Sequence, residues 1–158
     1  MATIDYRVGG TLGLPTVQAF NKVFAISRKI DCSVQNVPDD DTVQMLNIPA
    51  DTMVLDVIAN KITLEGGTLT FDVGDADDTD GYHDGINGNS GATAVSCNAS
   101  FALTEGAPNT IAPAYSKGGK YYDAAGVISI IFNDAADAAV IELTAICVNC
   151  DPRAGVAV

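Results

Sequence analysis

The side chains best suited to chemistry gather in one acidic stretch, residues 71–91, with the sequence FDVGDADDTDGYHDGINGNSG. Six aspartates and five glycines lie in it, together with His83, the only histidine of the chain. Clustered carboxylates can bind Ca²⁺, and a histidine beside an aspartate can act as a general base. The same composition also forms solvated loops, in which aspartates accept hydrogen bonds from backbone amides.

The spacing of the aspartates does not match a known Ca²⁺ loop. With Asp75 in the first position, the EF-hand pattern requires glycine where Asp80 lies and glutamate where Ile86 lies. Oxygen density alone is a weak criterion for Ca²⁺, so we interpret the stretch as a solvated acidic loop and assign no metal ligands.

The cysteines do not form a complete zinc site. Cys147 and Cys150 make one C-x-x-C pair, CVNC, whereas a structural zinc site needs a second pair or additional histidines. A redox C-x-x-C opens a helix, but this pair closes a predicted strand. We therefore expect Cys32, Cys97 and Cys147 to be small core residues.

Catalysis has one candidate pair, His83 with Asp80 or Asp84. The sequence contains neither G-x-S-x-G nor H-E-x-x-H, so no nucleophile or zinc-binding helix accompanies the histidine. We interpret His83 as a surface residue paired with a neighbouring aspartate. Accordingly, no catalytic residue and no cofactor are assigned, and the protein is not expected to be an enzyme.

Composition indicates one acidic globular domain. The 158 residues are 47% hydrophobic and carry a net charge of −12, with 20 acidic and 8 basic residues. This charge argues against binding to nucleic acid or to anionic membranes, since both require Lys and Arg. No apolar run reaches the length of a membrane span, and no secretory signal is visible, so we expect an intracellular origin and reduced thiols.

Hydrophobic alternation predicts an all-β protein, an antiparallel β-sandwich of jelly-roll type. The stretch 71–91 is expected to be a long loop without strands, Gly66–Gly67 a hairpin turn, and 52–64 one bent strand with a bulge near Ala59–Asn60. A helix is the competing interpretation of 52–64. The expected strands are 4–8, 22–32, 42–48, 52–64, 68–73, 92–104, 126–132 and 138–148, and 117–122 is expected to be a turn that enters a short edge segment.

The chain is expected to divide into an extended N-terminal arm, 1–21, a sandwich domain, 22–148, and a C-terminal tail, 149–158. Arms of this kind often add a strand to a partner's sheet. The predicted partner-binding residues are Tyr6, Arg7, Leu12, Leu14, Lys117 and Lys120. The two lysines lie in KGGKYY and could pair with an acidic loop of the same chain or of another copy.

Three pieces of the sequence, taken in order, resemble the capsid decoration (cement) proteins of tailed bacteriophages. They are the glycine–aspartate run FDVGDADDTDGYHDG, the step Gly119–Tyr122 (GKYY), and the final strands GVISIIF and AVIELTAICV. The likeness extends from about Thr52 to Val148 and does not include the N-terminal arm.

The resemblance implies a non-enzymatic virion structural protein that decorates and stabilises a phage head. Its expected partners are the major capsid protein and further copies of itself, as a dimer or trimer, with neither nucleic acid nor membrane. Its expected location is the capsid exterior, after assembly in the host cytoplasm. The alternative function is a carbohydrate- or Ca²⁺-binding β-sandwich module of a viral fibre or adhesin.

Overall fold

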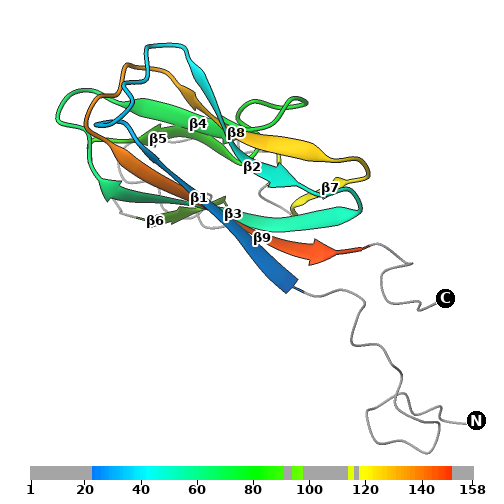
Figure 1. Ribbon diagram of the computed structural model, residues 1–158. Helices are drawn as coiled ribbons and strands as arrows, with labels where there is room; N and C mark the ends of the chain where they lie inside the picture. The colour runs from blue at the N-terminus through cyan, green and yellow to red at the C-terminus, as the bar shows by residue number, and fades with distance from the viewer. Residues whose placement is uncertain (1–22, 91–93, 98–113, 116–117, 151–158) are drawn as a thin grey trace, which may run out of the picture.

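A computed structural model describes residues 23–90, 94–97, 114–115 and 118–150, and these fold as an all-β sandwich (Figure 1). No helix within these ranges is long and apolar enough to cross a membrane. The strands are β1 (Val23–Asp31), β2 (Thr42–Ile48), β3 (Thr52–Thr63), β4 (Thr70–Gly74), β5 (His83–Asn87), β6 (Ala94–Ser96), β7 (Lys120–Tyr122), β8 (Gly126–Phe132) and β9 (Val140–Asn149).

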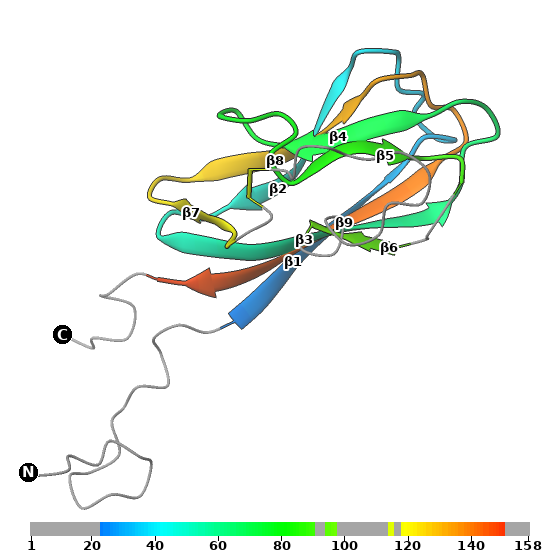
Figure 2. The ribbon, with the colours of Figure 1, turned by 180° about the vertical axis from the view of Figure 1, so that it is seen from behind.

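The strands form two antiparallel sheets that face each other, as both views show (Figures 1 and 2). One sheet has the order β1-β9-β3-β6, with β7 pairing to another part of β3, and the other has the order β2-β8-β4-β5. The pairs β1–β9, β2–β8, β3–β6 and β4–β5 are nested in sequence, like one long hairpin rolled over itself. This nesting is the jelly-roll arrangement, so the predicted fold class is confirmed.

The alternation of the last two long strands explains their central positions. In β9, Ile141, Leu143, Ala145 and Cys147 are fully buried and point into the core. In β8, Ile128, Ile130 and Phe132 do the same, and β8 lies between β2 and β4 as its apolar sequence predicts.

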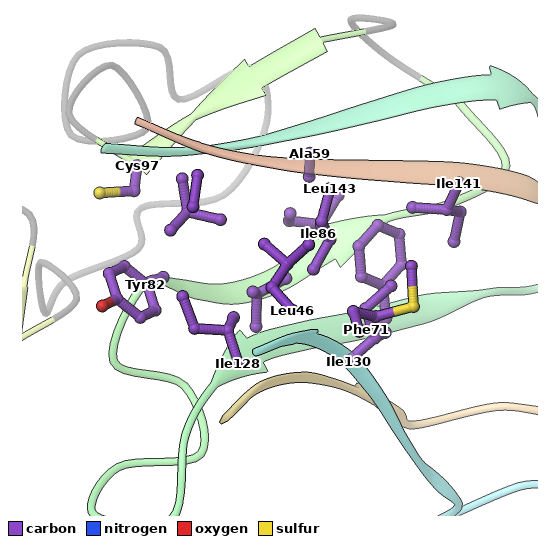
Figure 3. Close-up of a cluster of buried hydrophobic side chains, with 14 of the residues drawn as sticks. Leu46, Ala59, Phe71, Tyr82, Ile86, Cys97, Ile128, Ile130, Ile141 and Leu143 are labelled. Carbon is purple, nitrogen blue, oxygen red and sulfur yellow. The ribbon is translucent and has the colours of Figure 1, made fainter. Parts of the chain in front are cut away.

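The core fills the space between the two sheets. The close-up shows Leu46, Phe71 and Ile130 of one sheet opposite Ala59, Ile141 and Leu143 of the other (Figure 3). The rings of Phe71 and Phe132 lie 6.2 Å apart in a tilted contact. Dense apolar packing of this kind is the main source of the stability of such a domain.

Two expectations about turns were wrong. Gly66–Gly67 does not close a hairpin, because β3 and β4 belong to different sheets and the chain crosses the sandwich there. The stretch 71–91 is not one loop, because it contains the end of β4 and all of β5. Strand β5 forms because His83 and Ile86 are buried, while Gly85 at φ 65° provides the left-handed residue of an irregularity in the pairing with β4.

The predicted bent strand 52–64 is confirmed as β3, but its irregularities lie elsewhere than expected. The register shifts at Leu55 and at Ile62 instead of near Ala59–Asn60. The predicted strand 92–104 is described only as β6 and Cys97, and the predicted strand 4–8 lies outside the described residues. The proposed arm also lies outside them, so its boundary stays a prediction.

The first prediction concerns Gly119, at the start of β7. Its φ is 74°, and a Cβ there would lie 1.9 Å from the backbone oxygen of Val54. We expect Gly119→Ala to lower the free energy of unfolding by more than about 1 kcal/mol, because alanine adds both strain and a clash with backbone. Urea denaturation measures the change.

Gly67→Ala is the matched control, because its Cβ would meet nothing within 4 Å and its φ is not left-handed. It should be neutral or stabilising by up to about 1 kcal/mol. Equal losses in the two variants would contradict the placement of β7 against β3.

Candidate functional site

The acidic loop between β4 and β5, residues 75–82, turns its first carboxylate into the protein. The Asp75 side chain is only 3% exposed. Its Oδ1 accepts hydrogen bonds from the backbone N–H groups of Asp77 at 3.0 Å and Asp78 at 3.2 Å. This is the turn-capping role expected of an aspartate in such a loop.

Strand β7, from the opposite sheet, supplies the counter-charge. Lys120 Nζ lies 2.6 Å from Asp75 Oδ2 and 2.7 Å from Asp77 Oδ2. Tyr122 donates its hydroxyl proton to Asp75 Oδ2. The structure thus answers one question that the sequence left open, because Lys120 pairs with the acidic loop of its own chain.

Three tyrosines surround this ion pair. Tyr115 donates to Asp75 Oδ1 at 3.3 Å and accepts from Lys120 Nζ at 3.1 Å. The hydroxyls of Tyr82 and Tyr122 lie 3.1 Å apart, and since Tyr122 gives its proton to Asp75, Tyr82 is the donor between them. We call Asp75, Asp77, Tyr82, Tyr115, Lys120 and Tyr122 the Asp75–Lys120 cluster.

Two glycines of the loop make this packing possible. A Cβ on Gly74 would lie 2.2 Å from the backbone oxygen of Asp78, and one on Gly81 would lie 2.2 Å from the ring of Tyr115. The rings of Tyr82 and Tyr115 meet edge to face at 4.9 Å. The two glycines are therefore needed so that the loop backbone and the Tyr115 ring can approach closely, and not only for flexibility.

Asp75 and Lys120 are both charged at neutral pH, while Tyr122 keeps its proton. Burial by itself raises the pKa of Asp75, but hydrogen bonds from Lys120 and Tyr122 outweigh it and hold that pKa below its ordinary value. Burial opposes the charge of Lys120 too, yet its bonds to Asp75 and Asp77 raise its pKa. Burial raises the pKa of Tyr122 as well. A carboxylate with five donors and no proton to exchange is suited to holding two sheets together and is unsuited to acid–base catalysis.

The histidine occupies a place that the sequence interpretation did not anticipate. His83 is 1% exposed, on β5, and its Nε2 donates to the backbone oxygen of Val57 at 2.8 Å. Its Nδ1 is buried and has no hydrogen-bond partner among the described residues. Burial lowers the pKa of His83, so the ring is neutral. The prediction of a surface histidine paired with a neighbouring aspartate was wrong, because the irregularity in the β4–β5 pairing places both His83 and Ile86 on the buried face.

Two further aspartates of the loop, half-buried Asp78 and exposed Asp80, lie close together. The neighbouring Asp78 carboxyl, with burial a smaller contribution, raises the pKa of Asp80 to about 6. Because the folded pKa of Asp80 is raised, its contribution to stability grows as the pH falls, opposite in sign to that of His83, whose pKa is lowered.

The cysteines behave as the sequence predicted. Cys32, Cys97 and Cys147 are buried, and burial raises the pKa of each thiol to about 11. All four cysteines are free, and Cys150 is half-buried. Protonated, enclosed thiols are poor nucleophiles, so these residues pack the core.

Two buried charges were missed by sequence reasoning. Glu65 Oε2 accepts hydrogen bonds from the consecutive backbone N–H groups of Asp137, Ala138 and Ala139 at 3.0–3.2 Å. Lys61 Nζ donates to the backbone oxygens of Asn87 and Ser90, each at 2.6 Å. The sequence does place each of these charged residues close to the end of an apolar strand. A charge in such a place is expected to have a partner, but the sequence does not identify that partner.

The predicted partner-binding residues are only partly described. Tyr6, Arg7, Leu12, Leu14 and Lys117 lie outside the described ranges. Lys120 belongs to the Asp75–Lys120 cluster, with its side chain 15% exposed. Two shallow hollows, of about 420 and 410 Å³, lie beside Glu65 and beside Gln44, and neither is lined by the cluster.

The second prediction tests the ion pair. Asp75→Asn removes the charge that compensates Lys120, and we expect a loss of about 2–4 kcal/mol in the free energy of unfolding at neutral pH. Because the folded pKa of Asp75 is depressed, its contribution is present above pH 3.8 and is lost as the pH falls through the folded value. Asp77→Asn is the control, since that side chain is 80% exposed, and it should cost less than about 1 kcal/mol. Equal losses of stability in the two variants would contradict the conclusion that the buried Asp75, and not the exposed Asp77, is the main partner of Lys120.

The third prediction tests His83 by its pH dependence. Below pH 6.5 the histidine of the unfolded chain binds a proton, whereas the buried ring of the folded protein does not. The free energy of unfolding therefore falls as the pH drops below that value. His83→Gln keeps a donor for the Val57 oxygen and should flatten this loss. Asp78→Asn removes the opposing effect at Asp80 and should make the loss steeper. Thermal unfolding at several pH values between about 5 and 7.5 measures both slopes, and identical slopes in the two variants would contradict the assignment.

Comparison with known proteins bears on the fold. No protein-family model and no curated protein matches the sequence. A chain of the cyanophage Pam1 capsid asymmetric unit matches with a TM-score of 0.60 at 16% identity, over 94% of this chain and 98% of that one. A chain of the Ralstonia phage GP4 capsid matches with a TM-score of 0.55 at 14% identity, over 94% and 90%. A chain of the acid-stable capsid of Helicobacter pylori bacteriophage KHP30 matches with 0.53 at 9% identity, over 80% and 86%. The expected resemblance to phage capsid components is confirmed at the level of the fold.

Proposed function

We propose that this protein is a non-enzymatic structural component of a phage virion, and that it decorates and stabilises the head as a cement protein. The observation that carries the proposal is the shared architecture. A chain in the Pam1 capsid matches 94% of this chain over 98% of its own length, so the shared unit extends over nearly all of both chains and is more than one common motif.

The interior of the described domain supports a structural role. The Asp75 carboxylate, the Glu65 carboxylate and the Lys61 ammonium all have bonds within the protein that tie loops or sheets together. Such saturated groups stiffen a domain and leave little capacity for a reacting substrate. A cement protein needs this stiffness, because it transmits forces between neighbouring capsid subunits.

The charge supports a place on the capsid exterior. A chain with a net charge of −12 is repelled by packaged DNA, and the outside of the shell is the side away from it. The proposed partners are the major capsid protein and further copies of this chain, as a dimer or trimer. The proposed contact residues in the arm are Tyr6, Arg7, Leu12 and Leu14, with strand addition as the mechanism. Lys117 and Lys120 remain proposed contact residues.

The alternative, a carbohydrate- or Ca²⁺-binding module of a fibre or adhesin, has no specific observation in its favour. In the part of the chain that the structure describes, no three His, Cys, Asp or Glu side chains are grouped so that they could hold a metal. The alternative would gain support from saturable Ca²⁺ binding in calorimetry or from selective binding on a glycan array.

The fourth prediction tests the function with the full chain. Purified protein should co-sediment with phage heads assembled without it and should saturate at a fixed number of copies per head. It should also raise the temperature at which the heads release DNA. Deletion of residues 1–18 should weaken the binding at least about tenfold, without changing the Tm of the free protein. Absence of binding by the full chain would contradict the cement role, and unchanged binding by the deletion would contradict only the role of the arm.

A further inference from the structure

Among the strands at the edges of the two described sheets, β2 is the best suited to pair with a further strand. Strands β6 and β7 have three residues each, and β5 pairs irregularly with β4. Strand β1 carries exposed Arg28 and Lys29, and charges on an edge strand discourage pairing. Strand β2 has seven residues, TVQMLNI, and none of them is charged. An uncharged edge of this length is a place where a strand of another chain can add.

The backbone of β2 directs polar groups away from its sheet. The Phe132 N–H donates to the Asp41 oxygen at 3.0 Å, so the backbone oxygen of Asp41 faces β8. Backbone groups alternate in direction along an antiparallel ladder, so those of Val43 also face β8, and those of Thr42 and Gln44 face the outer side. No strand of the described ranges lies on that side of β2. The edge therefore offers donors and acceptors that an added strand can use.

A hollow lies beside the same edge. It has a volume of about 410 Å³, and its lining includes Val37, Pro38 and Val43. Val43 is only half-buried, because the sheet ends at β2 and leaves this side of the sandwich open. A strand added to β2 would bring a side chain of its own next to Val43, and an apolar side chain there would cover it.

The sequence of β2 recurs once in the chain, in the segment that precedes β1. Residues 16–21 read TVQAFN and residues 42–47 read TVQMLN, so Thr, Val, Gln and Asn are shared at four of six positions. Val17 and Phe20 have the same spacing as the two apolar residues that flank the irregularity of β2. The segment thus has the side-chain pattern of a strand of this sheet, although it lies outside the described residues.

We propose that residues 16–22 of a second copy add to β2 as an antiparallel strand. The inference rests on the proposed function and deepens it, because it names the segment and the edge through which neighbouring copies associate on the head. In the proposed register, Phe20 lies opposite Val43 and Val17 lies opposite Leu46. Both apolar side chains of the segment then meet apolar side chains of β2.

Charge favours this segment and this direction. Residues 1–22 contain one acidic and two basic residues and carry +1, whereas the rest of the chain carries −13. Three exposed aspartates, 39–41, directly precede β2. The antiparallel register places Lys22 opposite Asp41, where opposite charges attract across the strand pair. A parallel strand would place Lys22 beside Ile48, at the other end of β2.

The direction also requires that the segment come from another copy. Cys32 and Asp41, which follow β1 and precede β2, bond to the two ends of the connection 132–139, so these ends of β1 and β2 lie together. Lys22 precedes the opposite end of β1, which is about 30 Å away over nine residues (Figure 1). Lys22 of the same chain therefore cannot lie opposite Asp41. In dilute solution so short a contact is weak, but copies held side by side on a head have a high effective concentration.

The fifth prediction tests the contact in solution with the full chain. A labelled synthetic peptide of residues 13–22, GLPTVQAFNK, should bind saturably, as measured by fluorescence anisotropy at low salt. A peptide with Lys22→Glu should bind on the order of fivefold more weakly, because like charges then lie opposite each other. Asp41→Lys in the protein should restore the binding of this altered peptide and weaken that of the original one.

A matched pair of variants tests the edge. Gln44→Pro removes an outward N–H group and leaves the bonds to β8 in place, as proline on an edge strand allows, so it should abolish peptide binding. Gln44→Ala keeps the N–H group and should bind the peptide like the wild type. Equal Tm values establish that both variants are folded. If the proline variant does not fold, the exchange of charges between Lys22 and Asp41 decides, because it alters only exposed side chains of the folded protein.

Each contrary outcome overturns the inference. A peptide that does not bind shows that β2 is not the acceptor, and equal binding of the Lys22→Glu peptide excludes the antiparallel register. Binding that appears only after deletion of residues 1–18 from the protein shows that the chain's own segment occupies the edge. Head binding is measured separately, so a chain that binds heads and not the peptide contradicts this inference and leaves the cement role intact.

Discussion

The ion pair between Asp75 and Lys120 is the constraint on which the rest of the structure depends. Asp75 follows β4 in one sheet and Lys120 begins β7 in the other, so the bond of 2.6 Å ties the two sheets at one side of the sandwich. The glycines around it, the turn of the acidic loop and the short strand β7 are all arranged to bring these two charges together. A buried pair adds less stability than its Coulomb attraction suggests, because both charges lose water. The pair does fix the position of the Asp75 carboxylate, because both of its oxygens accept hydrogen bonds from surrounding donors.

The same side of the sandwich has two more polar connections between the sheets. His83 of β5 donates to Val57 of β3, and Lys61 of β3 donates to Asn87 of β5. Both connections lie where the first sheet is completed only by the short strands β6 and β7 in the described chain. Short strands bury little apolar area, so hydrogen bonds and charges have to fix the spacing of the sheets there. The long strands β8 and β9, in contrast, contribute buried apolar side chains such as Ile130 and Leu143 to the core between the sheets.

The sequence predicted what depends on local alternation and missed what depends on distant partners. The bounds of β2 and β8 follow directly from runs such as TVQMLNI and GVISIIF, because period-two patterning and flanking turns are local properties. The jelly-roll class follows from the number and spacing of such runs. The direction of His83 could not be predicted, since glycines and aspartates masked the two buried positions of β5. The partner of Lys120 lies 45 positions away in the sequence, and only the fold brings it close.

The distribution of charge also separates the carboxylates that hold the fold together from those that lie at its surface. Carboxylates that enter the protein, at Asp75 and Glu65, are matched by donors, whereas Asp78 is half-buried and Asp80 is exposed, and the proximity of Asp78 raises the pKa of Asp80. The acidic loop therefore solubilises the chain at one end while its first residue holds the sheets together.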